Sequence, residues 1–265
     1  MKKITIIGLG WLGFPLAQKL QSEGWQVAGT KRTMGDLPIE CYPLDLNYLE
    51  ITPEIERILA AEAMVIALTP SISNEDDYLS GIQKLTSLSI TKGVNHLIFI
   101  SSTSVLPMLQ GDFDENTVID PNSLLARVEK WLLSRKINCD ILRLAGLVGK
   151  QRHPVFYLAG KTNLKEAGQP VNLVHLDDCL AAISLLLSKP NGQRIFHLCS
   201  PKHPSRQAYY SEIATRLGLA DLHFSDENQP LVRTIKATKI CDELGFVYRY
   251  EDPYLFELEL NENKE

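Results

Sequence analysis

Three glycines near the amino terminus have a spacing that serves phosphate binding. Residues 8–13 form the pattern G-x-G-x-x-G, which follows the apolar run of residues 3–7 and precedes leucines at helical spacing. In a strand–turn–helix, the first glycine allows the tight turn, the second lets the backbone approach a pyrophosphate, and the third lets helix and strand pack closely. The N–H groups and the dipole at the helix start then attract the anion. The expected cofactor contacts here are Gly8, Gly10, Trp11, Leu12 and Gly13.

The residues about twenty positions further on indicate which dinucleotide is bound. An NAD site usually has an acidic residue there, which accepts hydrogen bonds from the ribose hydroxyls. This chain has Thr30, Lys31 and Arg32 instead, and its first carboxylate beyond them is Asp36. Two cations and a hydroxyl donor suit the dianionic 2′-phosphate of NADP. We expect NADP to be the preferred cofactor, with NAD as the alternative if both cations are solvated loop charges.

Two later positions are expected to face the same ligand. Asp45 comes just past the expected strand of residues 42–44, where such folds often meet the adenine. Thr69 and Pro70 follow the strand of residues 63–68 and are expected to line the pyrophosphate or the nicotinamide ribose. These assignments rest on position, and Asp45 or Thr69 could instead cap a helix.

Regularly alternating strands and helices must position these residues. Continuous apolar runs separated by crossover helices predict a parallel sheet covered on both faces, which is the doubly wound α/β plan. Ligands of such sheets bind outside the carboxyl ends of the strands. The expected strands are residues 3–7, 25–29, 42–44, 63–68, 96–100, 139–144, 171–174 and 195–199. The expected later helices are residues 53–61, 76–92, 123–134, 177–188, 208–217 and 238–244.

The pattern predicts a Rossmann-type domain with a small appended lobe. We expect residues 1–145 and 171–199 to form the dinucleotide-binding domain. Residues 146–170, which are rich in Gly, Lys and Arg and therefore loop-like, join residues 200–265 in a small C-terminal substrate-binding lobe.

The composition of the chain argues against several classes of protein. The chain has 265 residues and a formal net charge of −5, which argues against a general nucleic-acid binder. No stretch approaches the ~20 apolar residues of a membrane span. The five cysteines are scattered and contain no C-x-x-C, so we expect no metal site and no disulfide framework. A cytoplasmic protein is the resulting expectation.

Three later segments carry a family resemblance: residues 99–106 are FISSTSVL, residues 143–149 are RLAGLVG and residues 174–178 are VHLDD. They resemble, in this order, the SS-x-x-VYG, LR-x-x-x-VYG and VHVDD segments of the extended short-chain dehydrogenases/reductases of the epimerase/dehydratase type. A narrower resemblance, to the YeeZ-like proteins, is carried by GLGWLG, SSTSV, DILRLAGLVG, RHP, VNLVHLDD and ELGF. The first resemblance implies an extended Rossmann fold, and the second implies an atypical branch of that superfamily.

The resemblance also implies a reaction site, of which one part is missing. The superfamily's chemistry uses a serine or threonine, a tyrosine and a lysine, and Ser102 matches the serine. Registered on Glu129, the positions of the Tyr-x-x-x-Lys pair hold Pro121 and Leu125, neither of which can transfer a proton. The usual acid/base pair is therefore expected to be absent.

Substitutes for that pair are expected beyond the strand of residues 139–144. His153 could act as an acid or base near neutral pH, and Arg152 could clamp an anionic substrate. The expected substrate contacts are Thr103, Arg152, His175, Arg206 and Tyr210. A structural role is the alternative for His175, and one of Tyr209 and Tyr210 is expected in the core.

Two functional hypotheses follow. The first is an NADP-dependent oxidoreductase or epimerase of a small molecule, in which Ser102 and His153 are catalytic. The second is a non-catalytic sensor, in which NADP binding shifts a conformation that a partner reads. A small-molecule substrate is the expected partner, neither nucleic acid nor membrane is expected, and a homodimer stays open.

Overall fold

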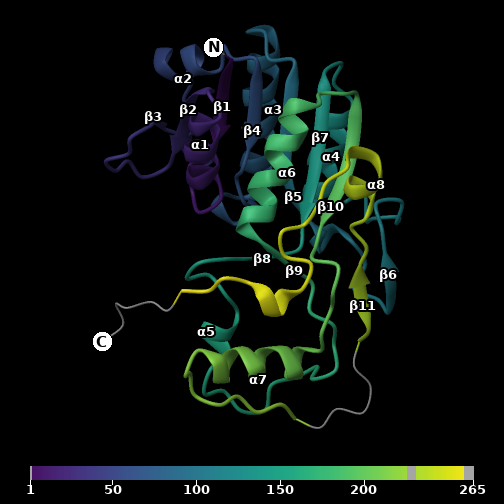
Figure 1. Ribbon diagram of the computed structural model, residues 1–265. Helices are drawn as coiled ribbons and strands as arrows, with labels where there is room; N and C mark the ends of the chain where they lie inside the picture. Colours follow the sequence, from purple (N-terminus) through teal and green to yellow (C-terminus); the bar gives the residue numbers. More distant parts are fainter. Residues whose placement is uncertain (1, 226–230, 260–265) are drawn as a thin grey trace. The chain divides into compact units, whose positions relative to one another are not determined.

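A seven-stranded parallel sheet dominates the computed structural model, which describes residues 2–225 and 231–259 (Figure 1). Its strand order is β10-β7-β5-β4-β1-β2-β3. The chain runs outward from β1 to β2 and β3, and then returns to place β4 on the other side of β1. A reversal of this kind opens a crevice at the carboxyl ends of the two strands beside it. The expected doubly wound α/β fold is confirmed.

The described chain divides into two compact units, each of which makes most of its residue contacts within itself. Unit 1 comprises Met1–Val105, Ile119–Arg143 and Leu180–Ile195; unit 2 comprises Leu106–Val118, Leu144–Cys179 and Phe196–Glu265. The strands of the large sheet are β1 (Lys3–Ile7), β2 (Gln26–Lys31), β3 (Glu40–Pro43), β4 (Ala63–Ile66), β5 (His96–Ser102), β7 (Asn138–Leu144) and β10 (Gln193–Leu198). The helices between them are α1 (Gly13–Ser22), α2 (Pro53–Ile58), α3 (Glu75–Thr91), α4 (Leu124–Leu133) and α6 (Leu176–Ser188), with 3-10 turns η1 (Leu46–Tyr48), η2 (Pro70–Ile72) and η3 (Thr103–Val105).

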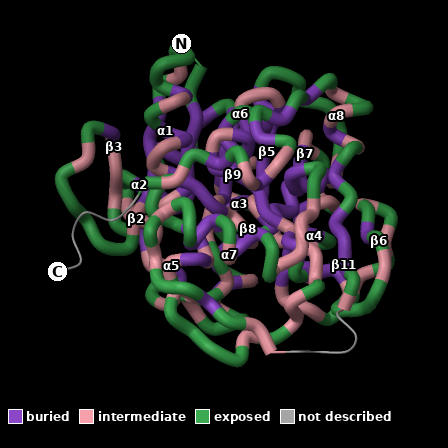
Figure 2. The backbone as a smooth tube through the Cα atoms, turned by 60° about the horizontal axis from the view of Figure 1, so that its bottom comes forward, coloured by how far each residue is buried: buried purple, intermediate pink, exposed green. Residues whose placement is uncertain are grey.

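Burial explains why these runs form strands. All four residues of β4 are buried, and β5 and β7 are buried over most of their length (Figure 2). A strand that is apolar at every position needs cover on both faces. In α1, Leu16, Ala17 and Leu20 lie on one buried face, and α3 packs against α4. Side chains start the helices: Thr52 accepts from Ile55 N in α2, and Asn74 accepts from Asp77 N in α3.

Unit 2 contains small elements around its own core. Two parallel strand pairs join β6 (Gly111–Phe113) to β11 (Arg233–Ile235), and β8 (Gly146–Val148) to β9 (Leu173–His175). The helices are α5 (Val155–Leu158), α7 (Arg206–Arg216) and α8 (Lys239–Leu244), with the 3-10 turn η4 (Pro253–Leu255). A hydrophobic cluster joins α5, α7 and the segment around η4 through Val155, Tyr209, Tyr210, Tyr250 and Phe256.

Two expectations about local structure differ from the fold. Residues 146–170 were expected as a loop, yet they contain β8 and α5. The strand expected at residues 25–29 extends to Lys31, because Thr30 and Lys31 pair with Tyr42 and Pro43 of β3. Among the described residues, no helix is long and apolar enough to cross a membrane.

Candidate functional site

The turn between β1 and α1 tolerates only glycine at two of the three glycine positions of the G-x-G-x-x-G pattern. Gly8 has φ +103°, and a Cβ on it would lie 2.7 Å from Leu68 Cδ2 and 3.0 Å from the Ala67 carbonyl oxygen. A Cβ on Gly13 would lie 2.0 Å from the Gly8 carbonyl oxygen. A Cβ on Gly10, by contrast, would meet no atom within 4 Å. Gly8 and Gly13 are therefore required by the turn itself, whereas Gly10 keeps space open beside it.

The start of α1 has no side-chain cap. The capping position is Leu12, whose side chain makes no hydrogen bond to the helix, and the first turn contains no acidic residue. The loop before it is fixed to β2, because Leu9 N donates to the Thr30 carbonyl at 2.7 Å and Gly8 N donates to Thr30 Oγ1 at 3.2 Å. An uncapped helix start carries partial positive charge and suits an anion. With the open space at Gly10, this arrangement fits a pyrophosphate.

The three residues expected at the ribose, which lie at the end of β2, differ in burial and in their contacts. Thr30 is buried, and its hydroxyl oxygen is occupied by Gly8 N. Lys31 is half-buried, and its charge opposes the effect of burial, which raises the pKa of the Cys41 thiol on β3. Arg32 is exposed, and its Nη1 donates to the Ile72 carbonyl at 3.5 Å. Of the three residues, Arg32 is the most exposed.

The segments after β3 and β4 meet beside Arg32. Asp45 caps η1 by accepting from Asn47 N and Asn47 Nδ2, both at 3.0 Å. Asn47 Nδ2 also donates to the Ile72 carbonyl at 3.2 Å, which ties η1 to η2. Pro70 is the first residue of η2. The structure thus brings Arg32, Asp45 and the Thr69–Ile72 region together at the carboxyl edge of the sheet, as expected for a dinucleotide groove.

The same stretch shows which residues the sequence did not reveal. Thr69 Oγ1 lies 3.2 Å from Ser71 Oγ rather than capping η2. Neither Asn47 nor the Ile72 carbonyl was expected at this site. The only local signal was the D-x-N pattern of residues 45–47, which favours a turn in which the aspartate accepts from the backbone two residues later.

The end of β5 is fastened by a buried ion pair. Arg143 of β7 holds Glu129 of α4 through Nη2–Oε2 at 2.7 Å and Nε–Oε1 at 3.1 Å. Ser101 Oγ donates to Glu129 Oε1 at 2.5 Å. All three side chains are buried. The neighbouring Ser102 is half-buried, and its Oγ accepts from Ser104 N at 3.1 Å, while Thr103 is buried at the start of η3.

No proton donor stands at the two positions that matched the family's Tyr and Lys. Pro121 is exposed and precedes α4, which begins at Leu124. Leu125 is buried in the first turn of that helix. Neither side chain can carry a proton.

In unit 2, His153 is fully buried with both ring nitrogens engaged. Its Nδ1 accepts from Val155 N at 3.1 Å, so Nε2 carries the proton and faces Tyr209 Oη at 2.9 Å. Tyr209 in turn donates to the Pro253 carbonyl at 3.3 Å. In this conformation His153 reaches no substrate, and its expected role as an acid or base stays a prediction. Tyr209 and Tyr210 are both buried, where only one was expected in the core.

The burial of His153 should make the protein unstable in acid. Burial lowers the pKa of His153 to about 4, aided by the charge of Arg216, whereas in the unfolded chain it is 6.5. As the pH falls from 6.5 towards 4, the unfolded chain gains a proton that the folded protein does not bind. This linkage removes about 3 kcal/mol from the free energy of unfolding, an order-of-magnitude figure. The contribution of neutral, buried His153 to the free energy of unfolding is fully present above pH 6.5. It is lost progressively as the pH falls from 6.5 towards 4.

Urea unfolding of the wild type and of His153→Gln across this pH range measures the effect. The variant is less stable at neutral pH but loses this part of the acid dependence, so the two stabilities should converge as the pH falls. A gap between them that stays constant with pH would contradict the assignment.

The other expected substrate residues of unit 2 lie around the same hydrophobic cluster. The Arg206 guanidinium lies 5.8 Å from the centre of the Tyr210 ring, and that ring lies 6.0 Å from His153. Arg206, Tyr210 and His153 are therefore brought together. Arg152 is exposed in a tight turn, where its backbone exchanges two 3.0 Å hydrogen bonds with Gly149.

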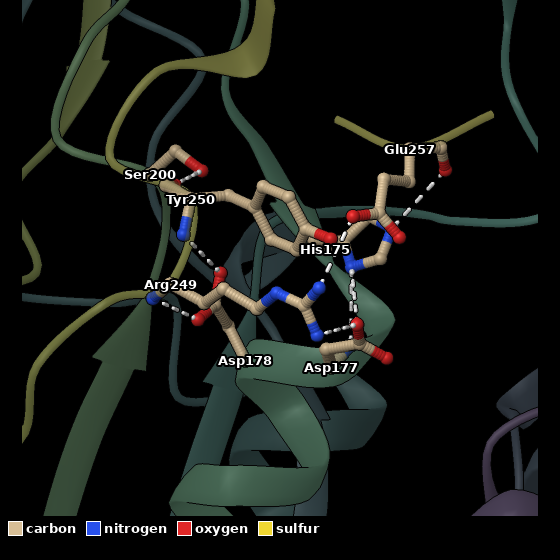
Figure 3. Close-up of polar contacts among 7 residues, drawn as sticks. All are labelled: His175, Asp177, Asp178, Ser200, Arg249, Tyr250 and Glu257. Atoms are coloured by element: carbon tan, nitrogen blue, oxygen red, sulfur yellow. Dashed lines mark hydrogen bonds and ion pairs between the residues drawn. The ribbon is translucent and has the colours of Figure 1, made fainter. Parts of the chain in front are cut away.

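His175 lies in a polar cluster between α6 and the C-terminal segment (Figure 3). Its Nδ1 accepts from Asp177 N at 3.2 Å, its Nε2 lies 3.4 Å from the Glu257 carbonyl, and the Tyr250 ring is 4.3 Å away. Burial lowers the pKa of His175, opposed by the Asp177 carboxylate. Arg249 bridges Asp177 and Glu257, each at 3.1 Å. Both polar atoms of the imidazole thus face protein groups.

Asp178 fastens the same segment from below the imidazole. Its carboxylate accepts from Arg249 N at 2.7 Å and from Tyr250 N at 3.3 Å (Figure 3). Burial raises the pKa of Asp178, against the effect of these two hydrogen bonds. The cluster therefore holds the C-terminal segment in place, while the role of His175 as a substrate contact stays a prediction.

Comparison with known proteins finds a relative along the whole chain. No protein-family model matches. Protein YeeZ of Escherichia coli strain K12 is 40% identical over 275 residues, which cover 98% of this chain and 100% of YeeZ. An identity of this size over both full lengths is a family relationship.

Solved structures share the fold at lower identity. A dTDP-glucose 4,6-dehydratase from Bacillus anthracis, in complex with NAD, superposes with a TM-score of 0.79 at 17% identity, covering 94% of this chain and 92% of that chain. A UDP-glucose 4-epimerase from Thermotoga maritima, with UDP-glucose, superposes with a TM-score of 0.76 at 16% identity, covering 93% of this chain and 94% of that chain. At such identities the likeness concerns the fold.

Proposed function

Because the chain belongs to the family of protein YeeZ and has the fold of dinucleotide-binding epimerases and dehydratases, we propose that it binds a nicotinamide dinucleotide, NADP in preference to NAD. The observation that carries the proposal is the uncapped start of α1 beside the open space at Gly10. The amides from Gly10 to Gly13 would hold the pyrophosphate, while Gly8 shapes the turn. Asp45 and the Thr69–Pro70 segment would face the adenosine and ribose ends, which the gathering of these loops supports.

The preference for NADP rests on the charges that follow β2. Lys31 and Arg32 stand where an NAD-binding protein usually has a carboxylate. A 2′-phosphate carries nearly two negative charges, and a guanidinium can bind it through two parallel hydrogen bonds. Thr30 supports the site indirectly, since its hydroxyl fixes Gly8 N.

The activity proposed is that of an oxidoreductase or epimerase acting on a small molecule. The bound nicotinamide supplies hydride transfer, and the protein supplies orientation and a proton. Ser102 supports this role, because its Oγ accepts from Ser104 N and so keeps its own proton to donate to a substrate oxygen. Thr103, Arg152, His175, Arg206 and Tyr210 are the proposed substrate contacts, and two arginines among them favour an anionic substrate.

His153 is the proposed acid or base in place of the missing tyrosine, and this part of the proposal has a structural requirement. The hydrogen-bond chain from Val155 N through His153 to Tyr209 must open before the imidazole can meet a substrate. Opening would also raise its pKa towards 6.5, where a histidine works best near neutral pH.

The same requirement favours a second candidate function, a non-catalytic NADP sensor. Pro121 and Leu125 leave no proton carrier at the two positions that correspond to the family's Tyr and Lys, and both ring nitrogens of His153 contact protein groups. A protein with an intact phosphate cradle and no proton carrier can still change conformation with its ligand.

Titration with NADPH and NADH, followed by nicotinamide fluorescence, tests the binding proposal. We expect NADPH to bind at least about tenfold more tightly, equal to ~1.4 kcal/mol. Equal or tighter binding of NADH would overturn the NADP preference, and no binding of either would overturn the function.

The reaction needs a separate experiment. Carbonyl compounds and sugar nucleotides, each incubated with the NADPH-loaded protein, should include one that oxidises the cofactor and fails to do so with Ser102→Ala. Tight binding without any oxidation, together with a ligand-dependent change in amide hydrogen exchange, would favour the sensor.

A further inference from the structure

Tyr78 is a buried tyrosine of α3 that the proposed function does not use. Its hydroxyl donates to the Leu68 carbonyl at 2.8 Å, and its ring is fully buried. The first turn of α3 fixes the residue, because Asn74 caps this helix and Tyr78 N donates to the Asn74 carbonyl at 2.9 Å. A firmly held side chain of α3 thus fixes one backbone carbonyl in the segment that follows β4.

Leu68 lies where the chain leaves the large sheet. The pairing of β4 with β1 ends at Ile66, which lies opposite Ile7. One residue later, Ala67 N still donates to the Ile7 carbonyl at 2.9 Å. The hydrogen bond from Tyr78 to Leu68 follows directly, so a side chain takes over where the strand pairing stops.

The residue that Tyr78 holds packs on the glycine turn. A Cβ on Gly8 would lie 2.7 Å from Leu68 Cδ2, so the Leu68 side chain leaves no space above this glycine. Thr69 and Pro70, which are proposed to face the ligand, come next in the chain. A shift of Leu68 would therefore disturb its contact with the turn and the start of η2 together.

The Tyr78 hydroxyl is not a substitute for the missing catalytic tyrosine. Burial raises the pKa of Tyr78, so the hydroxyl keeps its proton near neutral pH. That proton is donated to the Leu68 carbonyl, which is a backbone acceptor. A hydroxyl in this state can hold a backbone segment, but it does not release a proton to a substrate.

We propose that Tyr78 is a positioning residue for the dinucleotide, which holds the Leu68 carbonyl and thereby keeps residues 68–70 against the glycine turn before a ligand binds. This inference rests on the proposed function and adds to it a residue that touches no ligand. A segment that is already ordered raises affinity, because the free energy needed to order it is not subtracted from binding. Without the hydroxyl, the ligand itself has to order the segment.

Tyr78→Phe removes the hydroxyl and keeps the buried ring. NADPH and NADH should both bind roughly three- to tenfold more weakly, and by the same factor, because the lost hydrogen bond concerns the part of the site that both nucleotides share. In the ligand-free variant, amide hydrogen exchange should be faster in residues 68–72, while the strands of the large sheet keep their protection. Saturating NADPH should restore protection in residues 68–72.

Tyr248→Phe is the matched control for a general loss of stability. Tyr248 is also buried, and its hydroxyl donates to the Ala237 carbonyl at 3.3 Å, but both residues belong to unit 2. Because Tyr248 shares no hydrogen-bond partner with Tyr78, its variant should keep both nucleotide affinities within about twofold and should not change exchange in residues 68–72.

The outcomes separate the inference from the proposed function. Unchanged affinities in Tyr78→Phe, or equal weakening in Tyr78→Phe and Tyr248→Phe, would overturn the positioning role even though the wild type binds NADPH. Faster exchange throughout the large sheet of Tyr78→Phe would also overturn it, since the hydroxyl would then support the fold and not the segment. A wild type that binds neither NADPH nor NADH would overturn the proposed function itself, and the inference with it.

Discussion

Gly10→Ala is expected to weaken dinucleotide binding by at least about tenfold while leaving the fold intact. A Cβ at this position meets no protein atom within 4 Å, so the free energy of unfolding should change by no more than about 0.5 kcal/mol. The methyl group would instead occupy space beside the start of α1, where the proposed pyrophosphate approaches the backbone. Isothermal titration with NADPH and thermal unfolding of the same sample measure the two quantities.

Gly13→Ala is the matched variant with a different outcome. Its Cβ would overlap the Gly8 carbonyl oxygen at 2.0 Å, so the turn must shift whether or not a ligand binds. We expect a loss of about 3 kcal/mol in stability together with the loss of binding. Unchanged NADPH affinity in Gly10→Ala would mean that no phosphate lies at this turn, whatever Gly13→Ala does.

Arg143→Met is expected to cost roughly 3 to 5 kcal/mol in the free energy of unfolding. The substitution leaves the Glu129 carboxylate buried, with Ser101 as its remaining partner in this network. An unpaired buried charge is penalised by the loss of its hydration, and methionine offers no hydrogen-bond donor to replace the guanidinium. Chemical denaturation of the variant measures the loss.

The double variant Glu129→Leu with Arg143→Met is its control. With both charges removed, the apolar replacements should recover most of the lost stability, because the cost arises from the unpaired charge and not from the missing bond. A single variant that loses less than about 1 kcal/mol would show that the pair is solvated rather than buried. Since Ser101 precedes Ser102, the single variant should also weaken any activity that depends on Ser102.

The sheet was predictable because the composition of each central strand alone indicates a buried strand. Runs such as residues 63–68 and 97–100 are apolar throughout, and only a strand covered on both faces needs that composition. The glycine turn was predictable for a similar reason, since its requirements are local. The segment 146–170 was not predictable, because β8 and α5 are too short for periodicity, and β8 forms by pairing with a strand 27 residues away.

The candidate site was predictable only where a local sequence pattern determines which residues lie in it. Asp45 and Arg32 follow β3 and β2, and their cofactor contacts stay predictions. Their link through Asn47 and Ile72 joins residues 25 and 40 positions apart in the chain. No local pattern reveals such contacts. His153 was interpreted from its residue type alone. Its burial depends on Tyr209, 56 residues later, whose spacing in α7 says which face it occupies but not which residue it meets.

The way unit 2 is assembled also has a consequence during synthesis. Its core needs Tyr250 and Phe256 around His175, and Glu259 N donates to the Lys150 carbonyl at 3.1 Å. During synthesis, the apolar residues of α5 and α7 therefore stay exposed to solvent until the last described stretch of chain has left the ribosome. Unit 1 obtains most of its sheet much earlier. Chaperone dependence and co-translational aggregation should consequently concentrate in the second half of translation.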